Sequence, residues 1–316
     1  FRGVEFCVVN TAFDFLSCFN TIAFAFTNSS ALANCTSPPK PANANALPTA
    51  EVSQFSIAEL LFTKNISINN LEISNQNSHL DSLGNVKLIP GFSGSSNTWG
   101  SGKNVRFGIK IVASSRSLTG FSLNNLKIHD IYPSPVLSQN IHKGYGIKFE
   151  TQSDTVNSLL NFISNVEISH SEFSQTGHYG IWIKSIGLNN IDSVKNTDFQ
   201  ILDCDFENTG GSGFVPNKSK NILVQNCSFN HTGSSVDSRM WKRGSGLWTF
   251  DCKDVIVQHN YFMNAHGPQD SYGAHIDYGN ENVVFQYNYS YNNEGGFVEI
   301  LGDNINCGYR YNISVN

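Results

Sequence analysis

The sequence contains few charged residues and no run of basic ones. Only 14% of its 316 residues are Asp, Glu, Lys or Arg, and the formal net charge is −5. Nucleic-acid-binding surfaces need clustered Lys and Arg, so nucleic acid is not an expected partner. Long helical periodicity is also missing, which argues against an α/β enzyme. The apolar stretch 12–26 is interrupted by Asp14 and Asn20 and is too short and too polar to span a bilayer.

Cysteine is present in a modest, odd number. The seven Cys residues form no CxxC pair, so neither a zinc site nor a thioredoxin-like motif is indicated. Cys204 and Cys227 occupy equivalent positions of a repeat described below. Stacked small side chains at a turn are the preferred interpretation of this pair, and a disulfide is the alternative.

The first fifty residues differ in composition from the rest. The apolar stretch is followed by Ala31-Leu32-Ala33, which resembles a cleavage site, and by the Pro-rich segment 38–41. We interpret residues 1–50 as a signal-peptide-like leader and linker, which implies a secreted or periplasmic protein. The alternative is that this segment is unstructured or not native sequence. Because the chain starts at Phe1 and stops at Asn316 just after a repeat, a fragment is expected.

The C-terminal half repeats itself. Six segments of the form apolar-x-x-small-x-Phe/Ser can be superimposed, ending at Phe173, Phe206, Phe229, Phe262, Ser290 and Ser314. These ends are separated by 33, 23, 33, 28 and 24 residues, and a period in the twenties with loop-sized excesses is typical of a solenoid. Each repeat contains short runs rich in β-branched residues, too short for helices.

These features predict an all-β fold, a right-handed parallel β-helix. Looser coils begin near residues 66 and 121, and we expect residues 51–316 to form one domain, truncated at one or both ends. Asn260, Asn288 and Asn312 recur at one position and should form an internal amide ladder. That ladder is interpreted as structural.

One strand in each coil starts just after a Gly. Strand alternation places Ile147, Phe149, Ile181, Ile183, Ala274, Ile276, Val298 and Ile300 inward. The outward column is then Glu150, Lys184, Asn217, Asp251, Asp277 and Glu299. Asp251 joins it only if its strand carries one extra residue, as in a β-bulge.

Three acids on successive rungs indicate catalysis. Rungs are about 4.8 Å apart, so Asp251, Asp277 and Glu299 would repel one another and at least one pKa should rise. Adjacent rungs approach the spacing of a retaining glycosidase pair, and alternate rungs approach the upper limit for an inverting pair. The alternatives are a solvated acidic stripe or a Ca²⁺ site bridging coils. No other cofactor is expected.

Other residues of this face are candidate substrate contacts. His275 points outward and, beside the acids, should stay protonated to higher pH and donate to a sugar hydroxyl. Trp182 and Trp248 share an outward column and are candidate platforms for sugar rings, and Trp241 in the inserted loop 234–243 could wall the cleft. The alternative is that this loop only packs over the indoles. The further candidates are Lys184, Asn217, Arg243 and Glu294.

Residues 283–297, followed by Tyr309-Arg-Tyr-Asn-Ile-Ser314, resemble secreted bacterial right-handed parallel β-helix proteins that degrade polysaccharides. The resemblance covers roughly residues 61–316, and within it the chain is similar to glycoside hydrolase family 141, associated with α-L-fucosidase and xylanase activities. It implies an acid pair within the acidic column. Such proteins normally open with a strand-rich segment, whereas here the unusual first fifty residues stand in its place.

Three functions follow as alternatives. The leading hypothesis is a monomeric glycoside hydrolase acting on a cell-wall or algal polysaccharide. The second is a polysaccharide lyase acting on a uronate-containing glycan, for which Lys184, His275 or Arg243 would supply the base or neutralise the carboxylate. The third is a non-catalytic glycan-binding or adhesin solenoid, because fold alone does not separate these classes.

Overall fold

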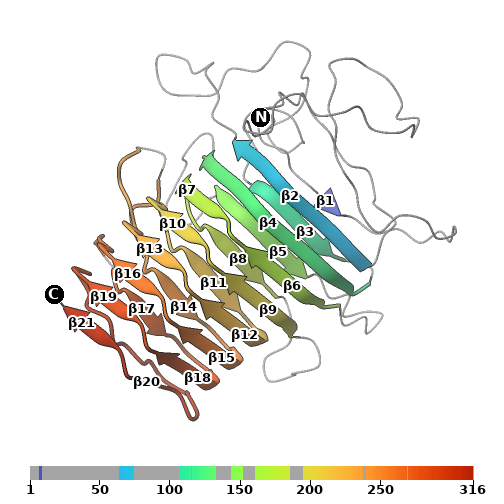
Figure 1. Ribbon diagram of the computed structural model, residues 1–316. Coiled ribbons are helices and arrows are strands. Elements are labelled where there is room, and N and C mark those ends of the chain that lie inside the picture. Colours follow the sequence, from blue (N-terminus) through green and yellow to red (C-terminus); the bar gives the residue numbers. More distant parts are fainter. Residues whose placement is uncertain are drawn as a thin grey trace, which may run out of the picture.

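The computed structural model describes residues 7–8, 64–74, 107–114, 116–132, 144–151, 161–185, 195–237, 240–268 and 270–315. Apart from β1 (Cys7–Val8), the predicted leader segment lies outside these residues. Every regular element within them is a β-strand. The strands stack into an elongated solenoid in which equivalent strands of successive coils lie side by side (Figure 1).

The chain winds through two hydrogen-bonded sheets of parallel strands. The first has seven strands: β1, β3 (Phe107–Ala113), β5 (Tyr145–Thr151), β8 (Ile181–Lys184), β11 (Phe214–Asn217), β14 (Leu247–Thr249) and β17 (Ala274–Ile276). The order in this sheet is the order along the chain, so each coil adds one strand to the growing edge. This sheet carries the predicted site.

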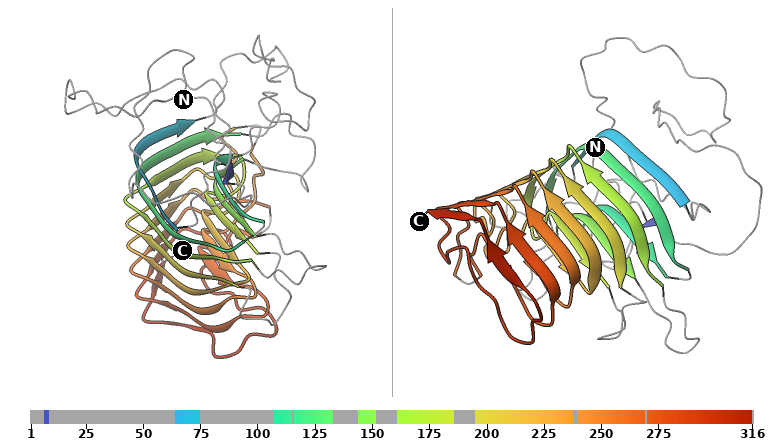
Figure 2. Two further views of the ribbon diagram at one scale, coloured as in Figure 1. Left: turned by 90° about the vertical axis from the view of Figure 1, so that its right-hand side faces the viewer. Right: turned by 60° about the horizontal axis from the view of Figure 1, so that its bottom comes forward.

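The second sheet forms the other two sides of the solenoid, joined through the long strand β4 (Leu118–Ile131), with β2 (Lys64–Ser74) also paired to β4. One side contains β6 (Ile163–Ser169), β9 (Asn196–Leu202), β12 (Ser219–Gln225), β15 (Lys253–Gln258), β18 (Glu281–Gln286) and β20 (Gly308–Arg310). The other contains β7 (Glu172–Thr176), β10 (Asp205–Glu207), β13 (Ser228–Asn230), β16 (Tyr261–Met263), β19 (Tyr289–Tyr291) and β21 (Ile313–Val315). Figure 2 shows the coils stacked along the solenoid. The predicted right-handed parallel β-helix is confirmed.

Identical side chains repeat inside the solenoid because parallel stacking aligns equivalent positions. Phe173, Phe206, Phe229 and Phe262 form a column whose neighbouring ring centroids lie 5.0, 4.6 and 4.8 Å apart. The strand glycines make room for these rings, since a Cβ at Gly180 would lie 2.6 Å from both the Phe206 ring and the Gly213 carbonyl oxygen. The repeat found in the sequence is therefore the core of the fold.

The predicted amide ladder is also confirmed. Asn260 donates to Asn288 Oδ1 over 3.0 Å, and Asn288 donates to Asn312 Oδ1 over 3.1 Å. Cys204 and Cys227 continue this column as free, buried thiols, as the stacking interpretation predicted. Amides and thiols at this turn satisfy backbone groups that face the interior.

The inward column is correctly predicted through Ile276, and its members up to that rung are buried. The prediction was wrong about burial in the last coil. Val298 is 62% exposed and Ile300 is 44% exposed, because no described coil lies over them.

Candidate active site

Three columns of outward side chains cross the seven-stranded sheet. Counting from the pairing of Trp248 with His275 and of Ile276 with Ile300, the central column runs Lys148, Trp182, Val215, Trp248, His275, Glu299. The second runs Glu150, Lys184, Asn217, Phe250, Asp277, and the third, one residue before each strand Gly, runs Tyr145, Tyr179, Ser212, Ser245, Tyr272.

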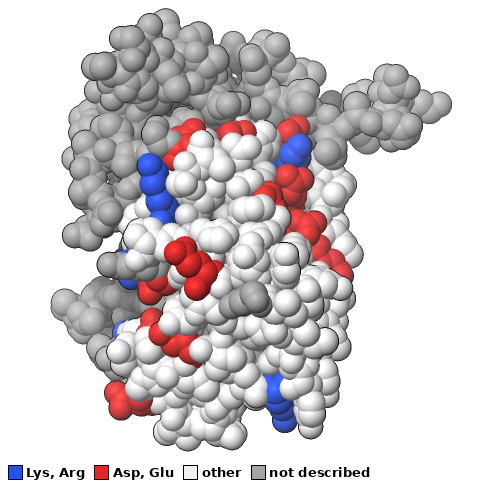
Figure 3. Space-filling view, turned by 90° about the vertical axis from the view of Figure 1, so that its left-hand side faces the viewer, with Lys and Arg blue, Asp and Glu red and all other residues white. Residues whose placement is uncertain are grey.

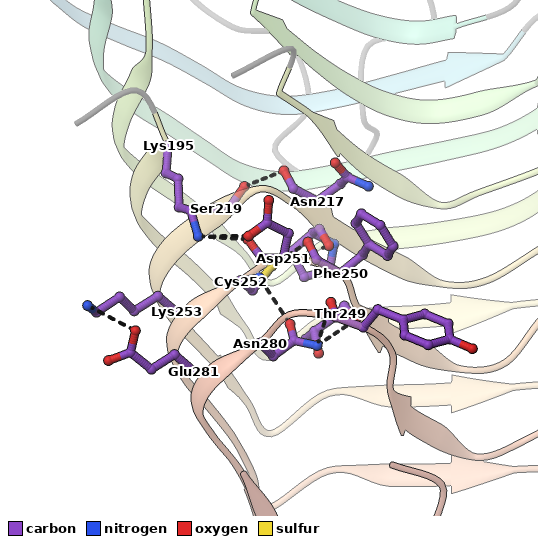
Figure 4. A network of polar contacts seen from close by, with 12 residues as sticks. Lys195, Asn217, Ser219, Thr249, Phe250, Asp251, Cys252, Lys253, Asn280 and Glu281 are labelled. Atoms are coloured by element: carbon purple, nitrogen blue, oxygen red, sulfur yellow. Dashed lines mark hydrogen bonds and ion pairs between the residues drawn. The ribbon is translucent and has the colours of Figure 1, made fainter. Parts of the chain in front are cut away.

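This register corrects the position predicted for Asp251. Asn217 pairs with Phe250, so Phe250 occupies the place between Asn217 and Asp277. Asp251 follows at a turn with a positive φ of 51°, where it is buried and accepts from Lys195 Nζ over 3.1 Å (Figure 4). Lys195 also donates to the Asp251 carbonyl over 3.0 Å. A carboxylate held by a buried ion pair at a turn is structural, and this geometry does not support a catalytic role for Asp251.

The position predicted for Glu299 is also wrong, by one column. Because Ile276 pairs with Ile300, Glu299 lies beside His275 and not beside Asp277. Its Oε2 lies 3.9 Å from His275 Nδ1, and burial together with the Glu299 carboxylate raises the pKa of the Tyr272 hydroxyl. Glu299 nevertheless remains close enough to Asp277 for its charge to raise the pKa of that carboxyl.

A different trio of acids is linked here through electrostatic interaction, and its new member is Asp270. Burial raises the pKa of Asp277 above its ordinary value, and the charges of Asp270 and Glu299 raise it further, against a lowering by the Tyr278 amide. Asp277 is itself half-buried and accepts from that amide over 2.9 Å. One carboxyl is thus disposed to hold a proton beside two other acids. Acidic side chains are scattered over the mostly uncharged face at the C-terminal end of the molecule (Figure 3).

Asp270 is ion-paired with Arg243. Arg243 Nε donates to Asp270 Oδ2 over 2.5 Å, and a second guanidinium nitrogen contacts the same oxygen. The guanidinium also lies over the ring of Trp241, 5.4 Å from its centroid. Arg243 was predicted to bind an anionic substrate group or to be solvated. The structure places it instead as the partner of an acid.

An aromatic wall continues from the acids along the sheet. Tyr179 is buried, and the rings of Trp182, Trp241 and Trp248 surround it at centroid distances of 5.8, 6.2 and 6.3 Å. All three indoles are partly exposed. The inserted loop thus packs onto the wall through Trp241 while its ring also borders the surface. Trp241 thus combines the two predicted alternatives: it lies in the wall, and it packs over the neighbouring aromatic rings.

His275 is outward-facing as predicted, but it is neither exposed nor protonated at neutral pH. Only 4% of the residue is accessible, and burial lowers its pKa to about 4, against a smaller raising effect of Asp270. Its Nδ1 lies 3.1 Å from Ser245 Oγ. The expectation of a charged donor is therefore wrong, because desolvation outweighs the neighbouring acids.

The other predicted contacts lie farther away. Lys184 is three rungs from Asp277, about 14 Å at ordinary strand spacing, and its ammonium lies over Trp182. Asn217 lies between them and is partly exposed. Glu294 is exposed, accepts from the Gly267 amide over 3.1 Å and lies 3.7 Å from His266. Binding roles for these three residues remain predictions.

Within the described ranges, no three His, Cys, Asp or Glu side chains form a group that could hold a metal ion. The Ca²⁺ alternative rested on Asp251, Asp277 and Glu299 sharing one column, and the register separates them. No helix in the described part of the chain is long and apolar enough to cross a membrane.

Sequence reasoning missed Asp270, Tyr179, Tyr272 and Ser245. Regular alternation gave no signal for the last three. Each stands immediately before a strand Gly and three places before the central column, so strict alternation would put it on the face opposite to that column. The alternation breaks at the Gly, and the ring of Tyr179 meets that of Trp182 while the ring of Tyr272 meets that of His275. Asp270 carries only the signal of an acid three residues before Gly273.

Comparisons with known proteins agree with this architecture. A lacto-N-biosidase of Bifidobacterium longum subsp. longum is 38% identical over 79 residues, which are 23% of this chain and 5% of that protein. The crystal structure of a GH136 lacto-N-biosidase from Eubacterium ramulus, as its selenomethionine derivative, matches with a TM-score of 0.60 and 25% identity. Its native form matches with a TM-score of 0.60 and 24% identity, and each match covers 79% of this chain and 41% of that one.

The chain therefore spans less than half the length of these relatives. They support a glycoside hydrolase-like β-helix, whereas the affiliation with family 141 remains a prediction. A family model described as the right handed beta helix region matches residues 107–312. Because this match covers more than half of the chain, the protein belongs to the right-handed β-helix family.

Proposed function

We propose that this protein is a glycoside hydrolase that cleaves glycans on the outer face of its seven-stranded sheet. The observation that carries the proposal is the cluster of Asp270, Asp277 and Glu299 beside a partly exposed aromatic wall. Glycosidases use two carboxyl groups in different protonation states, one as acid and the other as nucleophile or base. The similarity to lacto-N-biosidases supports the same reaction class.

The environments of the two aspartates assign different roles to them. Asp277 has a raised pKa because it is partly buried near two acids, so it suits the general acid that protonates the leaving oxygen. Asp270 is ion-paired with Arg243, so it suits the nucleophile or the base that activates water. Two carboxyl groups in different environments can divide the acid and base roles in this way. The charge of Glu299 contributes to the raised pKa of Asp277.

The aromatic wall would bind the sugars. Trp182, Trp241 and Trp248 offer partly exposed indole rings, and sugar rings pack their C–H faces onto such surfaces. The wall extends from the rung of Trp248, next to the acids, to the rung of Trp182 two coils away. An oligosaccharide lying along the solenoid axis could contact both the wall and the acids.

The relatives' name suggests the first substrate to test. We infer that a glycan carrying a lacto-N-biose unit is the best initial probe, since both relatives are lacto-N-biosidases. The cell-wall and algal polysaccharides predicted from the sequence form the comparison panel: fucoidan, xylan, pectin and alginate. Release of reducing ends from one of these, and not from a lacto-N-bioside, would redirect the substrate proposal without affecting the reaction class.

The geometry favours hydrolysis over the lyase alternative. A lyase must neutralise a uronate carboxylate, but Arg243 is already paired with Asp270, and Lys184 lies three rungs from Asp277. Three acids would also repel a uronate. Ultraviolet absorbance of an unsaturated uronide in the products would nevertheless favour elimination, because hydrolysis does not create that double bond.

The deciding experiment compares three Asp→Asn variants. Asp277→Asn and Asp270→Asn should each lower kcat at least about a hundredfold, the usual loss when a proton-transfer group or nucleophile is removed. Asp254→Asn is the matched control, because Asp254 is exposed on strand β15 of the second sheet. Unchanged turnover in both site variants would refute the proposal and favour a glycan-binding solenoid.

The pH profile supplies a second check. Since Asp277 must be protonated to act as the acid, kcat/KM of the wild type should fall as pH rises through the raised pKa of this carboxyl. This alkaline limb should be missing from the residual activity of Asp277→Asn. An identical limb in that variant would assign the acid role to another group.

A further inference from the structure

His275 is held rigidly next to the acids. Its ring stacks on Trp248, with centroids 5.9 Å apart and planes within 7°, and meets the Tyr272 ring at 73°. Trp248 is itself fixed, because its Nε1 donates to Ser212 Oγ over 3.0 Å. The imidazole therefore cannot turn without breaking contacts on several sides, which is typical of a preorganised site residue.

The hydrogen bonds of Ser245 favour a proton on Nδ1 of the His275 imidazole. Its hydroxyl donates to the Asp270 carbonyl over 3.0 Å and accepts from the Tyr272 amide over 3.2 Å. A serine hydroxyl has one proton and two lone pairs. With the hydroxyl proton assigned to the backbone carbonyl of Asp270, Ser245 Oγ accepts from His275 Nδ1, which lies 3.1 Å away. The neutral ring then has its proton on Nδ1 and a lone pair on Nε2.

That lone pair is left for a ligand. Among the described residues, no group hydrogen-bonds to Nε2. The buried polar atoms that lack a partner do not include Nε2, so this nitrogen is not fully sealed from solvent. Burial keeps the ring neutral above pH of about 4. His275 thus presents one uncharged acceptor beside carboxylates, within the electrostatic reach of Asp270 and 3.9 Å from Glu299.

We propose that His275 is a specificity-determining residue whose Nε2 accepts a hydrogen bond from a hydroxyl or amide N–H of the sugar bound beside Asp270 and Asp277. The inference rests on the proposed glycosidase function and goes beyond it. An analogue that lacks this donor leaves Nε2 desolvated and unpaired, and sites built to hydrogen-bond a substrate group reject such analogues strongly. The acids perform the chemistry, and His275 selects the sugar.

The tautomer is tested on the free protein. Long-range ¹H–¹⁵N spectra of protein labelled at histidine nitrogens distinguish the two neutral tautomers, and loss of a signal in His275→Gln assigns it. We expect the proton on Nδ1 at neutral pH, and an upfield shift of the Nε2 signal when lacto-N-biose is added to inactive Asp277→Asn. A proton on Nε2, or no shift at saturating sugar, would overturn the inference.

Kinetics test the role. With p-nitrophenyl lacto-N-bioside, His275→Phe keeps the ring stack but lacks the acceptor, and it should lower kcat/KM about tenfold to a hundredfold. His275→Gln, whose amide oxygen can accept, should recover part of this loss. His259→Phe is the control, since His259 is exposed and stacks on Tyr287 on another side of the solenoid.

The two proposals fail in distinguishable ways. Wild-type levels of kcat/KM in His275→Phe would refute the role of His275 while leaving hydrolysis intact. A wild-type protein that cleaves no glycan would refute hydrolysis, and the nitrogen shift on sugar binding would then still decide whether Nε2 accepts from a ligand.

Discussion

The buried, neutral His275 should make the fold lose stability in mild acid. Its pKa is about 4 in the folded chain and 6.5 as an ordinary value. Between these values the unfolded chain binds a proton that the folded chain excludes, so stability falls as pH falls. The full shift corresponds to about 3 kcal/mol, and the part lost between pH 7 and pH 5 is about 2 kcal/mol. The side chain is only 5% exposed, so solvent screening removes little of this effect.

The assay is urea-induced unfolding followed by tryptophan fluorescence at pH 7 and pH 5, for the wild type and His275→Gln. All other titrating groups are shared, so the difference between the two pH-dependent losses isolates His275. We expect the wild type to lose about 2 kcal/mol more than the variant. Parallel losses would refute the reasoning, because they would mean that the imidazole is protonated in the fold or solvated.

The remaining predictions concern the scaffold. Lys195→Met should cost about 3–5 kcal/mol in the free energy of unfolding, because it leaves the Asp251 carboxylate buried without its ion pair. Asn288→Ala should cost about 1–3 kcal/mol, since it leaves polar groups of the interior ladder unpaired, and unfolding by urea measures both losses. The thiols of Cys204 and Cys227 should react with a thiol reagent only after unfolding, because both are free and buried.

Much of the fold could be predicted from the sequence because a solenoid repeats its local rules. The column of phenylalanines, the amide ladder of Asn260, Asn288 and Asn312 and the buried strand positions each recur at fixed offsets. Each copy therefore confirms the others. Val298 and Ile300 in the last described coil are exposed although they occupy inward positions. Their burial would require a following coil, and a repeat pattern does not specify where the coils end.

The state of His275 could not be predicted from the sequence, because it depends on a balance between two opposing effects. Neighbouring acids raise the pKa of an imidazole, whereas burial lowers it. The sequence shows the acids but not the burial. Here Trp248 and Tyr272 cover the ring, and desolvation is the larger effect.

The acidic column shows why residue type is a poor guide to register. Aligning Asp251 with Asp277 required one extra residue in a strand. The only argument for that insertion was that it placed acidic residues in one column. The chain instead keeps the pairing in register from β14 to the bridge between Asn217 and Phe250. It then turns at Asp251, a residue type that tolerates a left-handed backbone and here pairs with Lys195. Backbone pairing along a whole rung outweighs any preference among exposed side chains. The strand register therefore decides which acids lie near one another. Asp277 directly follows β17, whereas Asp270 lies in the segment before this strand. A single column of strand positions therefore contains Asp277 but not Asp270.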